Sequence, residues 1–139
     1  MKRVIVYGAS LLLAMLASTV FAQPKVEDGW IRLMPPNVTM TAAYASISSD
    51  TADQLVSVSS EIAGKAEIHE TSMENGMMNM RPIESVDLGV GSVVELKPQG
   101  KHIMLIDLTR SLKEGEQVDL DLEFAESGKQ SVSFTVRKP

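Results

Sequence analysis

The chain contains only two histidines, and each has a methionine placed where both could serve one metal ion. Met104 stands two residues after His102, so both side chains project from one face if this segment is a β-strand. Met80 follows His69 after ten intervening residues, and Asn75-Gly76 between them is a strong signal for a two-residue hairpin turn. The sequence therefore offers two imidazole–thioether pairs.

The expected hairpin sets which residues of its two strands lie opposite each other. A turn at 75–76 puts Thr71 opposite Met80 and His69 opposite Pro82. His69 and Met80 are then diagonal neighbours on one face, roughly 5–8 Å apart at Cβ. A slip of one residue would send them to opposite faces.

Two imidazoles with two thioethers favour Cu(I) among the biological metals. Thioether sulfur is soft and uncharged, which makes it a poor ligand for calcium and magnesium, and zinc prefers a thiolate or carboxylate beside histidine. The chain has no cysteine, which excludes thiolate zinc sites and the His₂Cys centre of blue-copper proteins. Cu(I) binding should weaken on acidification, because protons compete with Cu(I) for the imidazole nitrogens but not for the thioether sulfurs.

Each of these residues also has an ordinary structural explanation. A lone histidine in a strand is most often hydrogen bonded within the fold, and a methionine most often fills the core. The joint pattern favours a metal site, because both histidines have a methionine within reach. Met73, Met77 and Met78 crowd the predicted hairpin tip, either as a soft outer shell that passes copper onward or docks a partner, or as an exposed loop without a role.

Four other side chains near these motifs are interpreted as structural. Met34 and Met40 flank the turn at 35–36, where packing is favoured over metal binding. Glu70 follows His69, but strand alternation points it away from that imidazole, which predicts a solvated residue. Trp30 is expected to anchor the core.

Residues 1–22 have the layout of a secretory signal peptide. A short basic start precedes an apolar run over 4–17, and Val20 and Ala22 place small residues before Gln23. The apolar run is shorter than the ~20 residues that a membrane-spanning helix needs. We expect cleavage after Ala22, export to the periplasm and a mature chain with no membrane span.

The mature region, residues 23–139, has the size of a single domain. Loss of Lys2 and Arg3 leaves 11 basic residues against 18 acidic ones, a net charge of −7. Phosphate would repel such a chain, so a nucleic-acid partner is not expected.

Short strands with regular turns dominate the mature region. Residues 117–124 and 131–137 alternate apolar and polar side chains, which is typical of half-buried strands. Further candidate strands are 42–48, 54–59, 66–71, 77–83, 92–96 and 102–108. The absence of convincing helical periodicity favours an all-β sandwich or small barrel.

The spacing of the two histidines and two methionines resembles the signature of the periplasmic PCuAC copper chaperones. His69, ten residues, Met80, twenty-one residues, His102, one residue and Met104 reproduce the pattern HX₁₀MX₂₁HXM. Segments 29–32, 78–82 and 96–105 are similar to that family as well, and the likeness spans nearly the whole mature region.

This resemblance implies a cupredoxin-like Greek-key β-sandwich or barrel, in which the four side chains converge on one Cu(I) at an exposed end. It implies a monomer that delivers copper to the CuA centre in subunit II of cytochrome c oxidase, alongside a Sco-type protein. Some relatives bind a second copper in a His- and Met-rich C-terminal tail. The sequence here ends at Val136-Arg-Lys-Pro139, so no second tail site is expected.

Two binding functions fit the same site: a chaperone with a specific acceptor, and a periplasmic copper buffering or tolerance protein without one. An enzyme is not expected, because no serine–histidine–acid constellation is evident and the metal site uses both histidines. A copper oxygenase with an N-terminal histidine brace is excluded if cleavage exposes Gln23. A β-sandwich adhesion or assembly module without metal is the remaining alternative.

Overall fold

The computed structural model describes residues 23–139, and every regular element in that range is a β-strand. They are β1 Lys25–Arg32, β2 Met40–Ser48, β3 Asp53–Ser59, β4 Ala63–Glu74, β5 Met77–Pro82, β6 Val86–Leu88, β7 Val93–Leu96, β8 Lys101–Leu108, β9 Gln117–Phe124 and β10 Gly128–Arg137. The predicted signal peptide, residues 1–22, lies outside the described residues. Within residues 23–139, no helix is long and apolar enough to cross a membrane.

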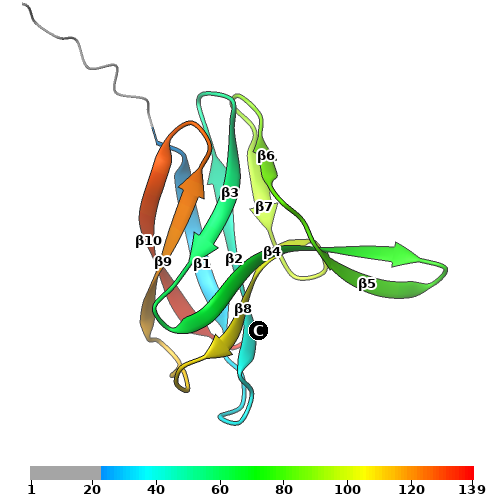
Figure 1. Cartoon of the computed structure of the whole chain (residues 1–139), viewed down its shortest axis with the longest axis vertical. Helices are drawn as coiled ribbons and strands as arrows, with labels where there is room; N and C mark the ends of the chain where they lie inside the picture. The colour runs from blue at the N-terminus through cyan, green and yellow to red at the C-terminus, as the bar shows by residue number, and fades with distance from the viewer. Residues whose placement is uncertain (1–22) are drawn as a thin grey trace, which may run out of the picture.

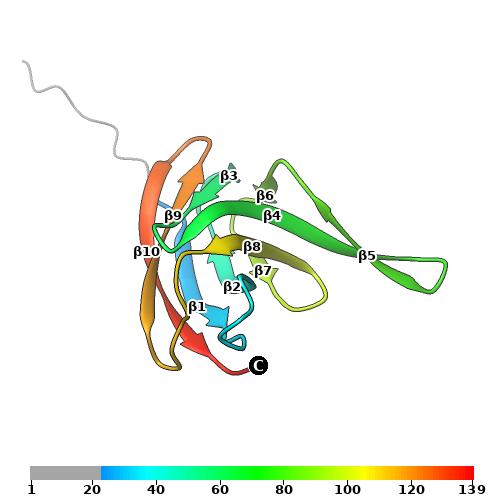
Figure 2. The ribbon, with the colours of Figure 1, turned by 60° about the horizontal axis from the view of Figure 1, so that its bottom comes forward.

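The strands form one hydrogen-bonded sheet that curls back on itself (Figures 1 and 2). Their order is β5-β4-β8-β2-β1-β10-β9-β3-β6, and β7 continues along the edge of β2 beyond β8. The β1–β10 pair is parallel, whereas the other strand pairs are antiparallel. The curl brings β3, β9 and β10 over β1, β2 and β8, which confirms the predicted all-β class.

Strand alternation builds the core from both walls. On β9, Leu120 and Leu122 are fully buried while the intervening side chains face out, as the sequence predicted. On β8, Ile103 and Leu105 are fully buried against the core, which sends His102 and Met104 to the other face. A one-residue slip of β8 would expose two large apolar side chains, so burial fixes the direction of the site residues.

The predicted strands match eight of the observed ones, with β4 longer at both ends than expected. The short β6 was missed, because three residues, Val86–Leu88, are too few to show periodicity. β1 was suggested only by the resemblance of segment 29–32 to a known family.

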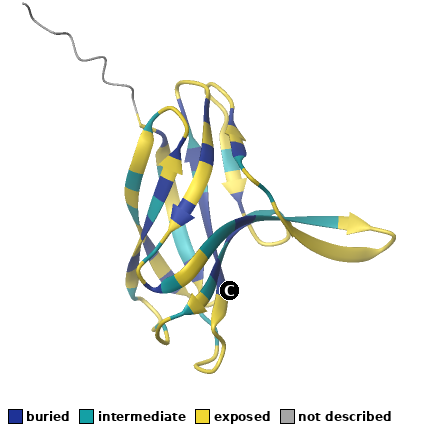
Figure 3. Cartoon of the chain, in the orientation of Figure 1, coloured by how far each residue is buried: buried dark blue, intermediate teal, exposed yellow. Residues whose placement is uncertain are grey.

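The outer half of β4 leaves the sandwich together with β5 as a projecting hairpin (Figures 1 and 2). Asn75 and Gly76 have φ angles of 52° and 75°, the positive values that a type I′ turn requires. Thr71 lies opposite Met80 and His69 opposite Pro82, so the predicted register is confirmed. Every residue of β5 is exposed (Figure 3).

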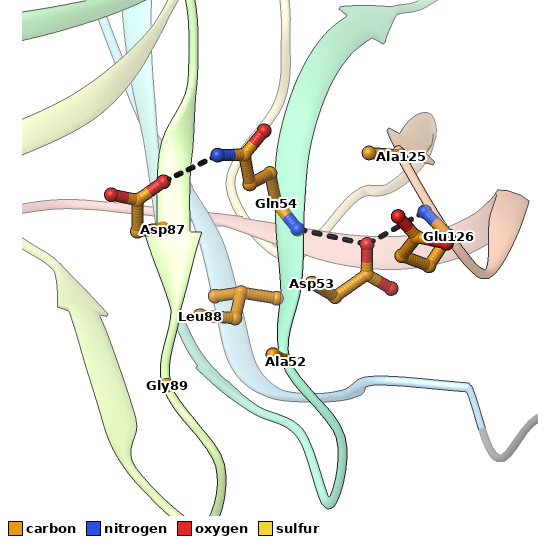
Figure 4. A pocket seen from close by; sticks show the side chains of 8 residues that line it. All are labelled: Ala52, Asp53, Gln54, Asp87, Leu88, Gly89, Ala125 and Glu126. Atoms are coloured by element: carbon orange, nitrogen blue, oxygen red, sulfur yellow. Dashed lines mark hydrogen bonds between the residues drawn. The ribbon is translucent and has the colours of Figure 1, made fainter.

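A buried carboxylate at the start of β3 fastens the turn between β9 and β10. Asp53 accepts hydrogen bonds from the backbone N–H groups of Gln54 at 2.8 Å and Glu126 at 2.8 Å (Figure 4). It also accepts hydrogen bonds from the backbone N–H and the hydroxyl of Ser127. Burial alone would raise the pKa of Asp53, but these hydrogen bonds, with the Ser127 hydroxyl foremost, hold that pKa below its ordinary value.

Asp53→Asn is expected to lower the free energy of unfolding by about 1–3 kcal/mol near neutral pH, because an amide accepts fewer of these hydrogen bonds. The lowered pKa makes the carboxylate's contribution fully present above the ordinary carboxyl pKa and lost as pH falls through the folded-state pKa. Urea unfolding of wild type and variant down an acid pH series measures the difference. Asp87→Asn, which changes an exposed partner of Gln54, is the control and should cost less than about 0.5 kcal/mol. A wild-type advantage that stays constant into strong acid would contradict this assignment.

Candidate metal centre

Three adjacent strands, β5, β4 and β8, bring the four predicted ligands to one face of the sheet. His69 on β4 lies directly opposite His102 on β8, and Met104 stands two residues further along β8. Met80 on β5 lies opposite Thr71, which is two residues from His69. Residues directly opposite, and residues two apart, project to the same face of an antiparallel sheet. All four side chains therefore share one face.

The two imidazoles are close neighbours with limited access to solvent. Their ring centroids are 5.9 Å apart and the ring planes are tilted by 44°. His102 is 3% exposed, whereas the side chain of His69 is 15% exposed. Tyr44 packs on the other side of His102, with ring centroids 6.4 Å apart. His102 is therefore buried, and the limited solvent access of the pair is through His69.

In the part of the chain that the structure describes, each imidazole has one nitrogen in a hydrogen bond and one buried nitrogen without a partner. His102 donates from Nδ1 to the Gly100 carbonyl oxygen at 3.1 Å, and His69 Nε2 lies 2.7 Å from a Glu67 carboxylate oxygen. An acceptor at each of these positions holds the single N–H of the neutral imidazole there, which leaves the lone pair on the other nitrogen of the ring. Among residues 23–139, His102 Nε2 and His69 Nδ1 contact no hydrogen-bond partner. Buried polar atoms are rarely left so, and a metal ion would satisfy both.

The two thioethers sit at different depths beside these nitrogens. Met104 is half-buried on β8, whereas Met80 is 60% exposed on the projecting hairpin. Met80, His102 and Met104 line one open pocket of about 490 Å³. His69 does not line it, although its ring centroid lies 5.9 Å from that of His102. Within the described part of the chain, no cluster of three His, Cys, Asp or Glu side chains offers a competing site.

A family model described as "Putative lipoprotein LpqE-like" matches residues 25–136. The chain belongs to the LpqE-like family. A curated relative, "Putative lipoprotein Lxx21020" of Leifsonia xyli subsp. xyli, is 28% identical over 116 residues. That alignment covers 81% of this chain and 69% of the relative.

Solved structures share the fold of this LpqE-like chain. The apo PCuAC domain from PmoF1 is 26% identical, with a TM-score of 0.72 over 86% of this chain and 97% of that domain. The apo form of DR1885 from Deinococcus radiodurans is 26% identical, with a TM-score of 0.66 over 100% of this chain and 97% of DR1885. DR1885 has also been solved in its Cu(I) form, with a TM-score of 0.61, 26% identity and coverage of 91% of this chain and 83% of that one. These likenesses confirm the predicted cupredoxin-like fold and the resemblance to PCuAC proteins.

Glu67 contacts His69 in the LpqE-like chain and was not among the residues predicted from the sequence. Glu67 stands two residues before His69 on the same strand, and alternation alone places it on the same face. Its other carboxylate oxygen lies 2.6 Å from Lys65 Nζ. Lys65 first, and His69 next, hold the pKa of Glu67 below its ordinary value, so it stays ionised. Glu70 instead contacts Arg81 at 3.3 Å, away from His69, as expected.

Glu67→Leu is expected to weaken Cu(I) binding about 10–100-fold, the usual effect of removing a partner that orients a metal-binding histidine. Glu67→Gln should retain most of the wild-type affinity, because the glutamine amide oxygen can still accept a hydrogen bond from the Nε2–H group of His69. Nitrogen-15 NMR of the imidazoles shows which ring nitrogen carries the proton. The His69 proton should stay on Nε2 in wild type and in the Gln variant, but not in the Leu variant. Unaltered His69 nitrogen shifts in the Leu variant would contradict the positioning role.

Three residues that the sequence suggested were structural lie near the site: Trp30 packs on Tyr44, and Met34 and Met40 line the pocket. Trp30 is half-buried and lies outside the core cluster, contrary to expectation. It packs on Tyr44 with ring centroids 4.7 Å apart, while the guanidinium of Arg137 lies 4.7 Å from its ring centroid. Met34 and Met40 line the same pocket as Met80 and Met104 rather than filling the core.

Proposed function

We propose that this chain binds one Cu(I) through His69, Met80, His102 and Met104, and carries it in the periplasm to an acceptor protein. The observation that carries the proposal is the pair of buried imidazole nitrogens that find no hydrogen-bond partner within residues 23–139, on the face that also presents two thioethers. Two imidazoles and two thioethers form a neutral, soft donor set that suits Cu(I).

The relatives support two elements of this proposal, copper binding and export. DR1885, which shares the fold at 26% identity, has been solved with Cu(I). The family description and the Leifsonia relative are both named as lipoproteins, which supports export of this chain. The acceptor that the PCuAC resemblance suggests is the CuA centre of cytochrome c oxidase, to which copper would be delivered alongside a Sco-type protein.

The unequal exposure of the ligands gives a route for release by ligand exchange. His102 is the most buried of the four ligands, and its Nδ1 is hydrogen bonded to the Gly100 carbonyl oxygen. Met80 is 60% exposed on a hairpin that projects from the sandwich (Figure 1). An incoming ligand from the acceptor can displace Met80 first, while the remaining three ligands keep hold of Cu(I). The exchange changes neither the oxidation state of the copper nor any covalent bond of the protein.

Transfer to an acceptor separates a chaperone from a buffering protein. Apo subunit II of cytochrome c oxidase, with its thiols reduced, is mixed with the Cu(I)-loaded protein, and filling of the CuA site is followed by NMR of subunit II, because a site that holds only Cu(I) has no visible absorption. The control is a small-molecule Cu(I) chelator that holds the same concentration of unbound Cu(I). Faster filling from the protein than from the chelator is the expected result. Equal rates would reject delivery and leave copper buffering as the function.

A further inference from the structure

Four rings form a row across one face of the sheet, from the proposed copper site to β1. His69 lies opposite His102 in the β4–β8 ladder, and Trp30 lies opposite Tyr44 in the β1–β2 ladder. Tyr44 is one step beyond the last pair of the β2–β8 ladder, which brings it beside His102. Successive ring centroids in the row are 5.9, 6.4 and 4.7 Å apart. Tyr44 therefore links the site to the body of the sandwich.

The Tyr44 side chain is buried against the site rather than within the core. It is 5% exposed, yet it lies outside the cluster of side chains that forms the core, whereas its neighbours Ala43 and Ala45 belong to that cluster. Strand alternation explains the difference, because the two alanines point to the core and Tyr44 points to the opposite face. Tyr44 lines the same open pocket as His102 and Met104.

The hydrogen bond of His102 does not by itself fix the plane of its ring. Nδ1 donates to the Gly100 carbonyl oxygen at 3.1 Å. The torsion that turns a histidine ring about its Cβ–Cγ bond has broad minima, so a ring held at one nitrogen can still rock. His69 packs on one side of the ring and Tyr44 on the other. Tyr44 is the firmer support, because it is more buried and its strand stays in the sandwich, whereas β4 leaves it (Figure 1).

Tyr44 is in turn held in place by its strand and by Trp30. Strand β2 is hydrogen bonded to β1, β7 and β8, and its residues 41–45 are all buried. The Trp30 ring is tilted by 41° at 4.7 Å from Tyr44, within the separations of roughly 4.5–7 Å that aromatic pairs prefer. The Arg137 guanidinium lies 4.7 Å from the Trp30 ring centroid. The row thus connects His102 to β2, β1 and β10.

We propose that Tyr44 is a positioning residue for copper binding. Its ring, backed by Trp30, fixes the plane of His102 and so keeps the Nε2 lone pair in one direction before Cu(I) arrives. A ligand that is already oriented loses less conformational freedom on binding, which raises the affinity. The effect on copper rests on the proposed function, whereas the ordering of the His102 ring is a property of the metal-free protein.

Carbon-13 relaxation of the histidine rings tests the positioning role in the metal-free protein. Tyr44→Leu keeps an apolar side chain but removes the ring, so the order parameter of the His102 ring should fall. Tyr44→Phe keeps the ring and should match wild type. Trp30→Leu should lower the order parameter less, because Tyr44 still contacts His102. The Phe134 ring, which is fully buried in the core, is the internal control and should stay as ordered as in wild type.

The affinity for Cu(I), from competition with a chelator, is the second measurement. Tyr44→Leu should weaken binding about tenfold, the lower end of the effect of losing a residue that supports a metal-binding histidine. Tyr44→Phe should bind as wild type does, which separates the loss of the ring from a general loss of stability.

The positioning role and the proposed function fail in different ways. A wild-type protein that binds no Cu(I) would reject the proposed function and any role of Tyr44 in copper binding with it. If wild type binds Cu(I), an unchanged His102 order parameter or an unchanged affinity in Tyr44→Leu would overturn the positioning role alone. Should Tyr44→Leu fail to fold, Trp30→Leu decides instead, and an unchanged His102 order parameter in that variant would overturn the role.

Discussion

His102→Leu is expected to lower the affinity for Cu(I) about a hundredfold while leaving the fold intact. Four-ligand zinc sites in small proteins bind with about 10–16 kcal/mol, so one ligand is worth roughly 3 kcal/mol, or about two decades in affinity. His102 carries a buried nitrogen with no hydrogen-bond partner among the described residues. Water cannot take the place of the lost imidazole as a copper ligand, because residue 102 is only 3% exposed.

The substitution should be structurally mild for two reasons. Leucine keeps most of the packing volume of the imidazole, and the Gly100 carbonyl oxygen still accepts a hydrogen bond from the Thr71 N–H at 3.2 Å. Competition with a Cu(I) chelator gives the affinity, and thermal unfolding checks the fold. Met77→Leu, on the opposite face of the hairpin, is the control and should bind as wild type does. An affinity unchanged by His102→Leu would remove His102 from the site.

Exchanging two neighbouring side chains, in Asn79→Met/Met80→Asn, is expected to weaken Cu(I) binding about a hundredfold by the same estimate per ligand. The double variant keeps the composition of β5 but moves the thioether to the opposite face of the hairpin, because Asn79 lies opposite Ser72 rather than Thr71. Its affinity should equal that of Met80→Asn alone, as measured by chelator competition.

A matched exchange isolates the effect of direction. Met77→Asn/Asn79→Met moves a thioether by two residues along the same, distal face of β5, so Cu(I) affinity should not change. Both double variants alter exposed positions, so neither should disturb the sandwich. If the first double variant bound Cu(I) as tightly as wild type, Met80 would not be a ligand in the proposed geometry.

The local geometry of the site was predictable from sequence because short-range rules determine it. Asn75-Gly76 fixed the turn type and the register of the hairpin, which set Met80 beside His69 as expected. The period of two on β8 set His102 and Met104 on one face. The same alternation could have identified Glu67, two residues before His69, as the neighbour of that imidazole.

Long-range pairing could not be predicted in the same way. The β4–β8 ladder places His69 directly opposite His102, although 32 residues separate them, and no local pattern encodes which strands become neighbours. The β2–β8 ladder similarly places Met40 near Met104. No local pattern in the sequence connects Met34 or Met40 with the site, so the sequence alone favours packing for both.

X-ray absorption at the copper edge, on the protein loaded with one equivalent of Cu(I), tests the four-ligand site most directly. We expect a first shell of two nitrogen and two sulfur neighbours, with the multiple scattering typical of two imidazoles. In His102→Leu the shell should lose one nitrogen and half of that imidazole signal. A wild-type shell without sulfur, or one that His102→Leu leaves unchanged, would rule out the four-ligand site.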